Sequence, residues 1–81
     1  MRPGVTVYTR TGCHLCERVE ALVEAARAKA DFDLSIADVD ADPQLRARYG
    51  LEVPLVAIDG NVLFNHAMDA AAFLDHIRKS Q

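Results

Sequence analysis

The two cysteines of this 81-residue chain, Cys13 and Cys16, are separated by two residues and lie where a strand-like segment meets a helix-like segment. At the start of a helix, this spacing sets the two sulfur atoms about one turn apart, close enough to form a disulfide. The positive end of the helix dipole also favours the thiolate of Cys13. The residue types and their spacing therefore predict a redox dithiol, with Cys13 as the attacking thiolate and Cys16 as the resolving thiol.

Two further side chains are placed to influence this thiol chemistry. Arg10 lies three residues before Cys13, and His14 lies inside the motif. Because a positive charge stabilises a nearby thiolate, we expect Arg10 to tune the reactivity of Cys13 and a protonated His14 to favour the thiolate. Arg10 and His14 are also candidate substrate-binding residues. The same residues allow a plainer interpretation, in which Arg10 is a surface charge and His14 is a solvent-facing helix residue without a role.

Other uses of the cysteine pair follow from the same residues. A structural disulfide that closes so short a loop stabilises the fold by about 2 kcal/mol at most, which is less than a disulfide between distant residues provides. Cys13 and Cys16 with one of His14, His66 or His76 could instead hold copper(I) or zinc in a metal carrier. An iron-sulfur cluster needs a second chain, because two thiolates complete half of a four-thiolate site. The cysteines could also be incidental in a non-catalytic interaction module.

Composition limits the classes of function. The chain is 51% hydrophobic and 26% charged with a net charge of -3, which is typical of globular proteins and predicts one domain over residues 1–81. Its nine basic residues are scattered, so no stripe is present to neutralise nucleic-acid phosphates. No apolar run is long enough for a membrane span, and no signal core follows the first residues. We therefore expect a cytoplasmic protein without nucleic-acid or membrane partners and without a cofactor or bound metal.

Hydrophobic spacing predicts alternating strands and helices in the first half of the chain. Residues 5–8 combine β-branched and aromatic types, as strands do. Residues 13 to about 30 carry apolar side chains at spacings of three and four, which indicates one face of a helix. Residues 31–36 alternate polar with apolar, which predicts a half-buried strand running on toward Val39. The apolar face of the predicted helix consists of Leu15, Val19, Leu22, Val23 and Ala26.

Two more helices are marked by their caps. Asp42 and Pro43 form an N-cap and first-turn proline, and Gly50 ends this short helix. Asp69 caps a last helix that carries basic residues at its C-terminal end. The predicted inward face of the last helix consists of Ala70, Phe73, Leu74 and Ile77.

The remaining segment predicts a hairpin. Residues 53–58 form an apolar run and residues 62–64 return beside it, joined by a tight turn at Asp59-Gly60 or Gly60-Asn61. The order of elements is then β-α-β-α-β-β-α, an α/β fold with a four-stranded mixed sheet flanked by helices on both faces. The first two strands should be parallel and the last two antiparallel. The cysteine motif falls at the carboxyl end of the first strand, where open α/β sheets bind ligands.

This order, the Cys-His-Leu-Cys motif at residues 13–16 and the later Val53-Pro54 pair together resemble the thioredoxin fold, specifically a small glutaredoxin-like protein. The resemblance spans essentially the whole chain and implies a thiol-disulfide oxidoreductase. It also implies a cis Val53–Pro54 bond facing the dithiol, with the Val53 backbone free to pair with an extended substrate. The alternative is an ordinary trans proline at a strand start.

The chain also departs from the glutaredoxin pattern. Glutaredoxins that use glutathione carry a Gly-Gly pair and then an acidic residue near the last helix, whereas residues 64–69 read Phe-Asn-His-Ala-Met-Asp. Asp69 matches the acidic position, which helps to hold the tripeptide in those proteins and makes Asp69 a candidate substrate-binding residue; alternatively, Asp69 is a plain N-cap. The motif holds His-Leu in place of Pro-Tyr, and no tryptophan precedes it as in thioredoxins. We therefore expect a protein or low-molecular-weight disulfide as substrate, with the missing glycines counting against glutathione.

Overall fold

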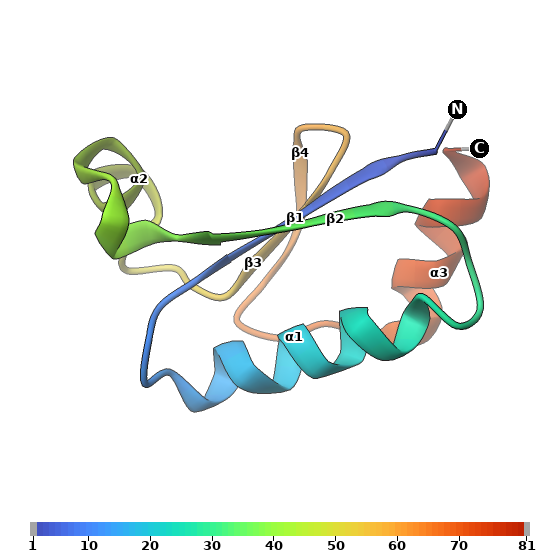
Figure 1. Ribbon diagram of the computed structural model, residues 1–81, viewed down its shortest axis with the longest axis horizontal. Helices are drawn as coiled ribbons and strands as arrows, with labels where there is room; N and C mark the ends of the chain where they lie inside the picture. The colour runs from blue at the N-terminus through green and yellow to red at the C-terminus, as the bar shows by residue number, and fades with distance from the viewer. Residues whose placement is uncertain (1, 81) are drawn as a thin grey trace.

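The computed structural model describes residues 2–80 and contains one four-stranded sheet and three α-helices (Figure 1). The order of elements is the β-α-β-α-β-β-α order predicted from the sequence, with one short 3-10 turn, η1, added before the second helix. The elements are β1 (Gly4–Thr9), α1 (His14–Ala26), β2 (Asp33–Asp38), η1 (Val39–Ala41), α2 (Pro43–Tyr49), β3 (Leu55–Ile58), β4 (Asn61–Asn65) and α3 (Ala70–Lys79).

The strands lie in the order β2-β1-β3-β4. The β1 and β2 strands are parallel, while β1 pairs antiparallel with β3 and β3 pairs antiparallel with β4. The predicted parallel and antiparallel pairings are confirmed. Because β1 is central, its carboxyl end and the cysteine motif that follows it lie between the ends of its neighbours.

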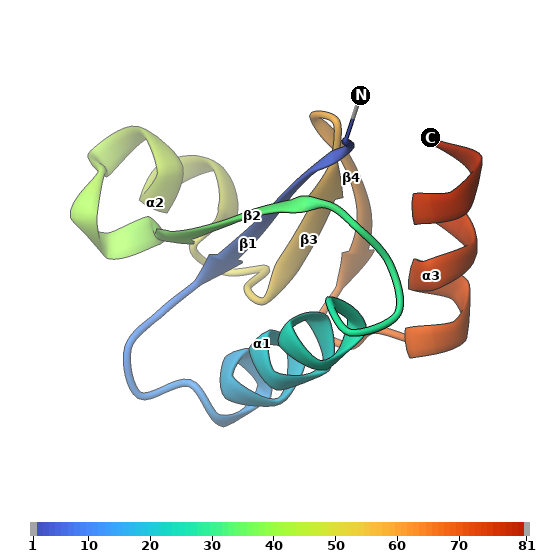
Figure 2. The same cartoon turned by 45° about the vertical axis from the view of Figure 1, so that its right-hand side comes forward.

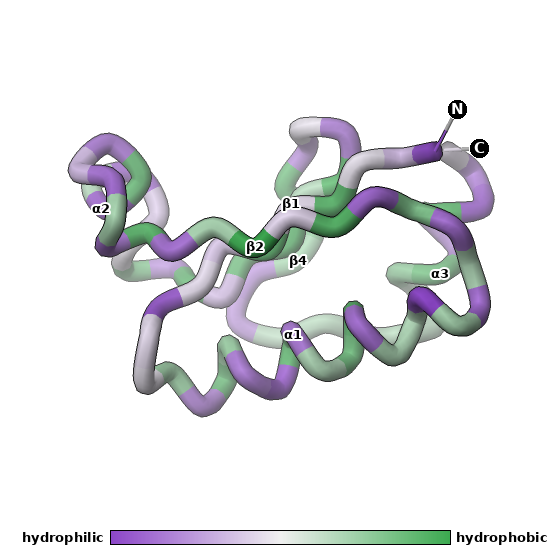
Figure 3. Tube along the Cα trace, viewed as in Figure 1, coloured by the Kyte–Doolittle hydropathy of each residue, from purple (hydrophilic) through white to green (hydrophobic). Residues whose placement is uncertain are grey.

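The core lies between one face of the sheet and the helices α1 and α3, which both lie on the same side of the sheet (Figures 1 and 2). Alternate residues of β1 and β3 point to this side, and the apolar stripe of each helix faces them. Along α1, apolar and polar residues alternate in the pattern of a half-buried helix (Figure 3). The Phe32 ring, in the loop after α1, contacts Phe73 edge-on at 5.4 Å between centroids. The main buried side chains are Val5, Val7, Val19, Val23, Phe32, Val56, Ile58, Phe73 and Ile77.

On the opposite face of the sheet, Leu55 and Ala57 of β3 are also buried. The Tyr8 ring, on the face opposite Val7, lies 4.7 Å from the Tyr49 ring of α2 between centroids. No residue of α2 is buried, and the helix lies at the end of the sheet rather than across it (Figure 1). Helices therefore reach both faces of the sheet, as predicted.

Three boundaries differ from the sequence prediction by two residues or more. The first helix ends at Ala26 instead of about residue 30, and residues 27–30 form turns. These turns bring Phe32 into the core, and burying an aromatic ring outweighs the helix propensity of the Arg-Ala-Lys-Ala segment. The second strand consequently begins at Asp33 and not at residue 31. The third strand begins at Leu55, after Pro54, and not at residue 53.

The predicted apolar face of the first helix is also partly wrong. Leu15 and Leu22 are 49% and 39% exposed, whereas Val19, Val23 and Ala26 are buried. The buried stripe of α1 begins instead at Cys16. Leu15 and Leu22 lie on the flank of the stripe, where they line surface grooves instead of the core.

The hairpin turn is at Asp59-Gly60, the first of the two predicted positions. Both residues have positive φ, 51° and 86°, as type I′ hairpin turns require. The Asp59 carboxylate also accepts a hydrogen bond from the Gly4 amide at 2.9 Å, which ties the turn to the start of β1. Separately, none of the helices in residues 2–80 is long and apolar enough to cross a membrane.

Candidate active site: a cysteine pair at a helix start

Cys13 is the N-cap of α1. Its backbone is extended, with φ -91° and ψ 111°, and its carbonyl accepts the first helical hydrogen bond from the Glu17 amide at 3.1 Å. The preceding Gly12 has φ 81°, which lets the chain turn sharply out of β1 into the helix. The Cys13 amide donates a hydrogen bond to the Arg10 carbonyl at 3.3 Å. This turn leaves the Cys13 side chain partly exposed at the positive end of the helix dipole.

Cys16 lies one turn further along α1 and is fully buried. Both cysteines are free thiols in this structure. The Cys16 amide donates a hydrogen bond to the Cys13 sulfur at 3.2 Å, so the sulfur of the N-cap residue takes the place of the usual capping oxygen. The structure thus brings the two predicted cysteines together, one accessible and one enclosed.

Burial raises the pKa of the Cys16 thiol above its ordinary value of 9.0. A hydrogen bond with Cys13 raises this pKa further, and hydrogen bonds from Thr9 and the Arg10 backbone oppose the rise without cancelling it. Cys16 is therefore a protonated thiol at neutral pH. This suits a group that reacts second, after an accessible partner.

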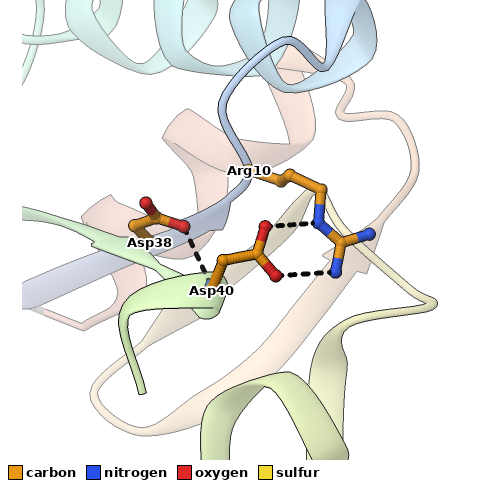
Figure 4. A network of polar contacts seen from close by, with 3 residues as sticks. All are labelled: Arg10, Asp38 and Asp40. Carbon is orange, nitrogen blue, oxygen red and sulfur yellow. Dashed lines mark hydrogen bonds and ion pairs between the residues drawn. The ribbon is translucent and has the colours of Figure 1, made fainter. Parts of the chain in front are cut away.

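Arg10 is held by a residue that the sequence analysis did not identify. Its guanidinium donates two hydrogen bonds to the Asp40 carboxylate, at 2.8 and 3.1 Å (Figure 4). The Asp40 amide in turn donates to the Asp38 carboxylate at 2.9 Å. This pairing raises the pKa of Arg10 and lowers that of Asp40, and the cysteines add a smaller rise to the Arg10 pKa. The Arg10 guanidinium is thus paired mainly with the Asp40 carboxylate and only to a smaller extent with the cysteines.

His14 points into solvent. Its side chain is 96% exposed, and its Nδ1 atom lies 3.6 Å from the Glu17 carboxylate. This geometry agrees with the plainer interpretation of a solvent-facing helix residue, and a role for His14 in substrate binding stays a prediction.

The Val53–Pro54 peptide bond is cis. Pro54 is buried and Val53 is partly exposed, directly before β3. The Pro54 carbonyl accepts a hydrogen bond from the His66 amide at 2.8 Å, which joins this segment to the loop after β4. Substrate pairing by the Val53 backbone stays a prediction.

Asp69 is the N-cap of α3, and its carboxylate accepts a hydrogen bond from the Ala71 amide at 3.0 Å. The capping interpretation is therefore confirmed, and substrate binding by Asp69 stays a prediction. In the loop before it, where glycines were missing from the sequence, His66, Ala67 and Met68 form one wall of a groove of about 160 Å³. The other wall is formed by Leu15, Arg18, Val19 and Leu22 of α1.

A metal centre is not favoured by the side chains present. Within residues 2–80, no three His, Cys, Asp or Glu side chains are grouped so that they could hold a metal ion. His14, one of the three predicted third ligands, extends into solvent beside Glu17. The soft-metal alternative from the sequence analysis therefore lacks a third ligand in the described part of the chain.

Thr9 and Glu20 are site residues that the sequence analysis missed. The Thr9 hydroxyl donates to the Glu20 carboxylate at 3.3 Å, and Thr9 lowers the pKa of the Cys16 thiol against the effect of burial. A signal for both residues is present in the sequence. Thr9 continues the inward alternation of Val5 and Val7, and Glu20 lies four residues after Cys16, on the same face of the helix.

Solved structures similar to this chain share the thioredoxin fold. The solution structure of protein Ne2328 from Nitrosomonas europaea matches with a TM-score of 0.81 and 25% identity, covering 95% of this chain and 93% of that one. A thioredoxin mutant from Halobacterium salinarum matches with a TM-score of 0.73 and 24% identity over 96% and 74% of the two chains. Protein XcR50 from X. campestris is 34% identical, with a TM-score of 0.67 over 89% and 96% of the chains.

Sequence comparison gives the family. Uncharacterized protein Rv0508 of Mycobacterium tuberculosis and uncharacterized protein Mb0520 of Mycobacterium bovis are each 38% identical over 64 residues, or 73% of this chain. The chain spans 66% of the length of these curated relatives. The family model described as Glutaredoxin-like domain (DUF836) matches residues 4–78. With its thioredoxin fold and its cysteine pair at the start of α1, the chain belongs to this glutaredoxin-like domain family.

Proposed function

We propose that the protein is a thiol-disulfide oxidoreductase that carries two electrons through a reversible Cys13–Cys16 disulfide. The observation that carries this proposal is the asymmetry of the pair. Cys13 is accessible at the helix start, while Cys16 is buried one turn away with its amide directed at the Cys13 sulfur. Such a pair separates the attacking from the resolving role.

The proposed reaction has two exchanges. The Cys13 thiolate attacks one sulfur of a substrate disulfide, forming a mixed disulfide and releasing the other substrate sulfur as a thiolate. Cys16 then attacks the Cys13 sulfur, so that the Cys13–Cys16 disulfide forms and the second substrate sulfur leaves. The substrate gains two electrons and the dithiol loses two. The same steps in reverse oxidise a substrate dithiol.

The proposed substrate is a protein or low-molecular-weight disulfide. The groove between Leu15 of α1 and Met68 is largely apolar and begins beside the motif, which favours an apolar side chain next to the substrate disulfide. Glutathione is less favoured, because Ala67 and Met68 occupy the loop where glutathione users carry two glycines. A reducing compartment, the cytoplasm, is the proposed location because a dithiol must be reduced to attack.

The test is the reduction potential of the pair. Purified protein is equilibrated against a series of glutathione or dithiothreitol redox buffers, and free thiols are trapped and counted by mass spectrometry. We expect a reversible two-electron transition between roughly -280 and -120 mV, where catalytic dithiols lie. C13S and C16S variants serve as controls and should show no such transition.

Two results would contradict the proposal. Thiols that never pair would leave an interaction module with incidental cysteines. Protein that is isolated with copper or zinc protecting both thiols would restore the metal carrier.

A further inference from the structure

The α1 helix carries a second stripe of side chains beside its buried one. Leu15, Arg18, Leu22 and Ala25 follow one another at spacings of three and four, so they share one face of the helix. All four side chains are exposed, although three of them are apolar. The stripe is therefore an apolar surface that the core does not use, with a positive charge at Arg18.

Two grooves lie along this stripe and share Leu22. The first, of about 160 Å³, is closed on its other side by the loop before α3. The second, of about 90 Å³, is closed on its other side by Ala70 and Leu74 of α3. Because Leu15 lies between the two cysteines in the sequence, the first groove begins beside the motif, and the second groove continues it along α1.

The chargeable groups that line the two grooves are all basic. Arg18 and His66 line the first groove and Lys29 lines the second, whereas no Asp or Glu of residues 2–80 lines either one. Acidic residues of α1 lie on its other flank, where Glu17 and Glu20 line a cleft beside β2. The grooves therefore form a basic region on a protein whose net charge is -3.

Arg18 and Lys29 are free to bind a carboxylate from outside. Both side chains are exposed, and within the described chain neither forms an ion pair or a side-chain hydrogen bond. Arg10, Arg27 and Lys79, by contrast, each pair with a carboxylate of the protein itself. A partner can thus pair with Arg18 or Lys29 without first breaking an internal ion pair.

Resting on the proposed function, we propose that the two grooves bind an extended acidic segment of a substrate protein, with apolar side chains in the grooves and carboxylates on Arg18 and Lys29. From Leu15 to Ala25 the helix advances about 15 Å, at roughly 1.5 Å per residue. An extended chain covers that distance in about five residues. The substrate cysteine reaches Cys13 while its neighbours in the sequence lie in the grooves. The grooves therefore favour a protein over a low-molecular-weight disulfide, which would fill only the first.

Mixed disulfides between short peptides and thionitrobenzoate measure this preference. The acidic probe is a peptide of one cysteine, two leucines and two glutamates, and the basic probe has lysines in place of the glutamates. Each is made with the cysteine at either end, because the segment can run in either direction along α1. Attack by Cys13 on the peptide sulfur releases coloured thionitrobenzoate, and Cys16 then attacks Cys13 and releases the peptide. Stopped-flow absorbance gives the rate constant of the first step.

The readout is the ratio of the rate constants for the acidic and the basic probe, because a general loss of activity cancels from it. We expect wild type to prefer the acidic probe by at least roughly fivefold at low salt, the scale of a few exposed ion pairs. High salt should remove most of this preference. R18E should reduce the ratio to one or below. R78E makes the same change in the last turn of α3, outside both grooves, and should keep the wild-type ratio.

A third probe tests the apolar part of the surface. It replaces the leucines of the acidic peptide with serines, and wild type should react with it roughly threefold more slowly, because less apolar area is buried. L22S should shrink this difference, since Leu22 lines both grooves. L63S changes a similarly exposed leucine of β4 that lines neither groove, and it should retain the difference.

The outcomes distinguish the two proposals. Wild-type protein that stays joined to the peptide through Cys13, as C16S must, would overturn the oxidoreductase proposal, and mass spectrometry detects this species. Free peptide released at equal rates from the acidic and basic probes would overturn the substrate segment alone. An equal change of ratio in R78E and R18E would also overturn it, because it would mark an effect of net charge. Wild type that is dimeric in analytical ultracentrifugation while L22S is monomeric would overturn it in favour of a second copy of this chain in the grooves.

Discussion

Arg10 and Asp40 form a two-point ion pair that joins the cysteine loop to the end of β2, with hydrogen bonds of 2.8 and 3.1 Å. Parallel pairing of the two strands places Thr9 opposite Asp38, which brings the residues after each strand within reach of one another. The Arg10 charge, which the sequence predicts to act on the Cys13 thiolate, therefore also pairs with the Asp40 carboxylate outside the motif.

Removing that carboxylate should make Cys13 more reactive. In D40N, Arg10 loses its ionic partner and its charge becomes available to the Cys13 thiolate. We expect alkylation of Cys13 by iodoacetamide, measured at low salt in a C16S background, to accelerate by roughly threefold, the scale of exposed charge interactions. D75N, which breaks an exposed ion pair with Lys79 on α3, is the control and should have no effect. An acceleration that persists in high salt would contradict an electrostatic cause.

The same pair should make stability depend on acid pH. Arg10 lowers the pKa of Asp40 below its ordinary value of 3.8, so the folded state favours the ionised carboxylate. The resulting stabilisation is present above that ordinary value and is lost as the pH falls through the lower folded pKa. The difference in free energy of unfolding between wild type and D40N should therefore be constant near neutral pH and shrink below about pH 4. Urea denaturation at several pH values measures it, and a difference that grows in acid would have the wrong sign.

Cys16 should impose the opposite trend in alkali. Burial raises its pKa above the ordinary value of 9.0, so the unfolded chain loses the Cys16 proton at a lower pH than the folded protein does. Stability from the neutral thiol is complete below the ordinary pKa and is lost as the pH rises toward the folded pKa. Relative to C16A, the reduced wild type should lose up to about 1.4 kcal/mol per pH unit in that window. Parallel stability curves for the two proteins would contradict the raised pKa.

Gly12 and Gly60 provide a matched pair for testing the turn before Cys13. Both have positive φ, 81° and 86°, and a Cβ atom on either would meet nothing within 4 Å. G12A and G60A should each therefore cost about 1 kcal/mol of stability through backbone strain alone. Only G12A should also change the alkylation rate of Cys13, because only that turn sets the N-cap. Equal alkylation rates in the two variants would show that the turn does not position the thiol.

The contact between the Phe32 and Phe73 rings should contribute strongly to the stability of the core. Phe73 is fully buried and meets Phe32 edge-on, so F73L removes both packing volume and an aromatic pair. We expect a loss of about 1 to 2 kcal/mol in urea denaturation. F64L is the control, since Phe64 is only partly buried and its ring partner is His76. A loss in F64L as large as that in F73L would argue against a core centred on Phe73.

Local signals were enough to predict the fold. Asp42 and Asp69 cap their helices through side-chain hydrogen bonds to the amides two residues on, as their types indicated. The Asp59-Gly60 turn follows equally from local chemistry. The end of the first helix could not be found in this way, because residues 27–30 have good helix propensity. What ends the helix is the burial of Phe32, a contact with α3 more than forty residues away.

The site was predictable to the extent that it lies within one segment. Cys13 and Cys16 follow from their spacing, and the helix between them fixes their geometry. Asp40 and Glu20 could not be assigned to the site from the sequence, because each joins it through a side-chain contact between distant segments. Asp40 contacts Arg10, and Glu20 contacts Thr9. The Arg10–Asp40 contact depends on the register of β1 and β2, and the Thr9–Glu20 contact depends on how closely α1 packs on the sheet.

The hydrogen bond from the Cys16 amide to the Cys13 sulfur makes the reactive atom part of the helix itself. A thiolate accepts such a bond strongly and a neutral or bonded sulfur accepts it weakly. Chemistry at Cys13 therefore changes the strength of the side-chain hydrogen bond that caps α1. The oxidation state of the protein should therefore change the hydrogen-exchange rate of one amide, that of Cys16. A partner that contacts the start of this helix can thus distinguish the Cys13 thiolate from its oxidised products without contacting the sulfur.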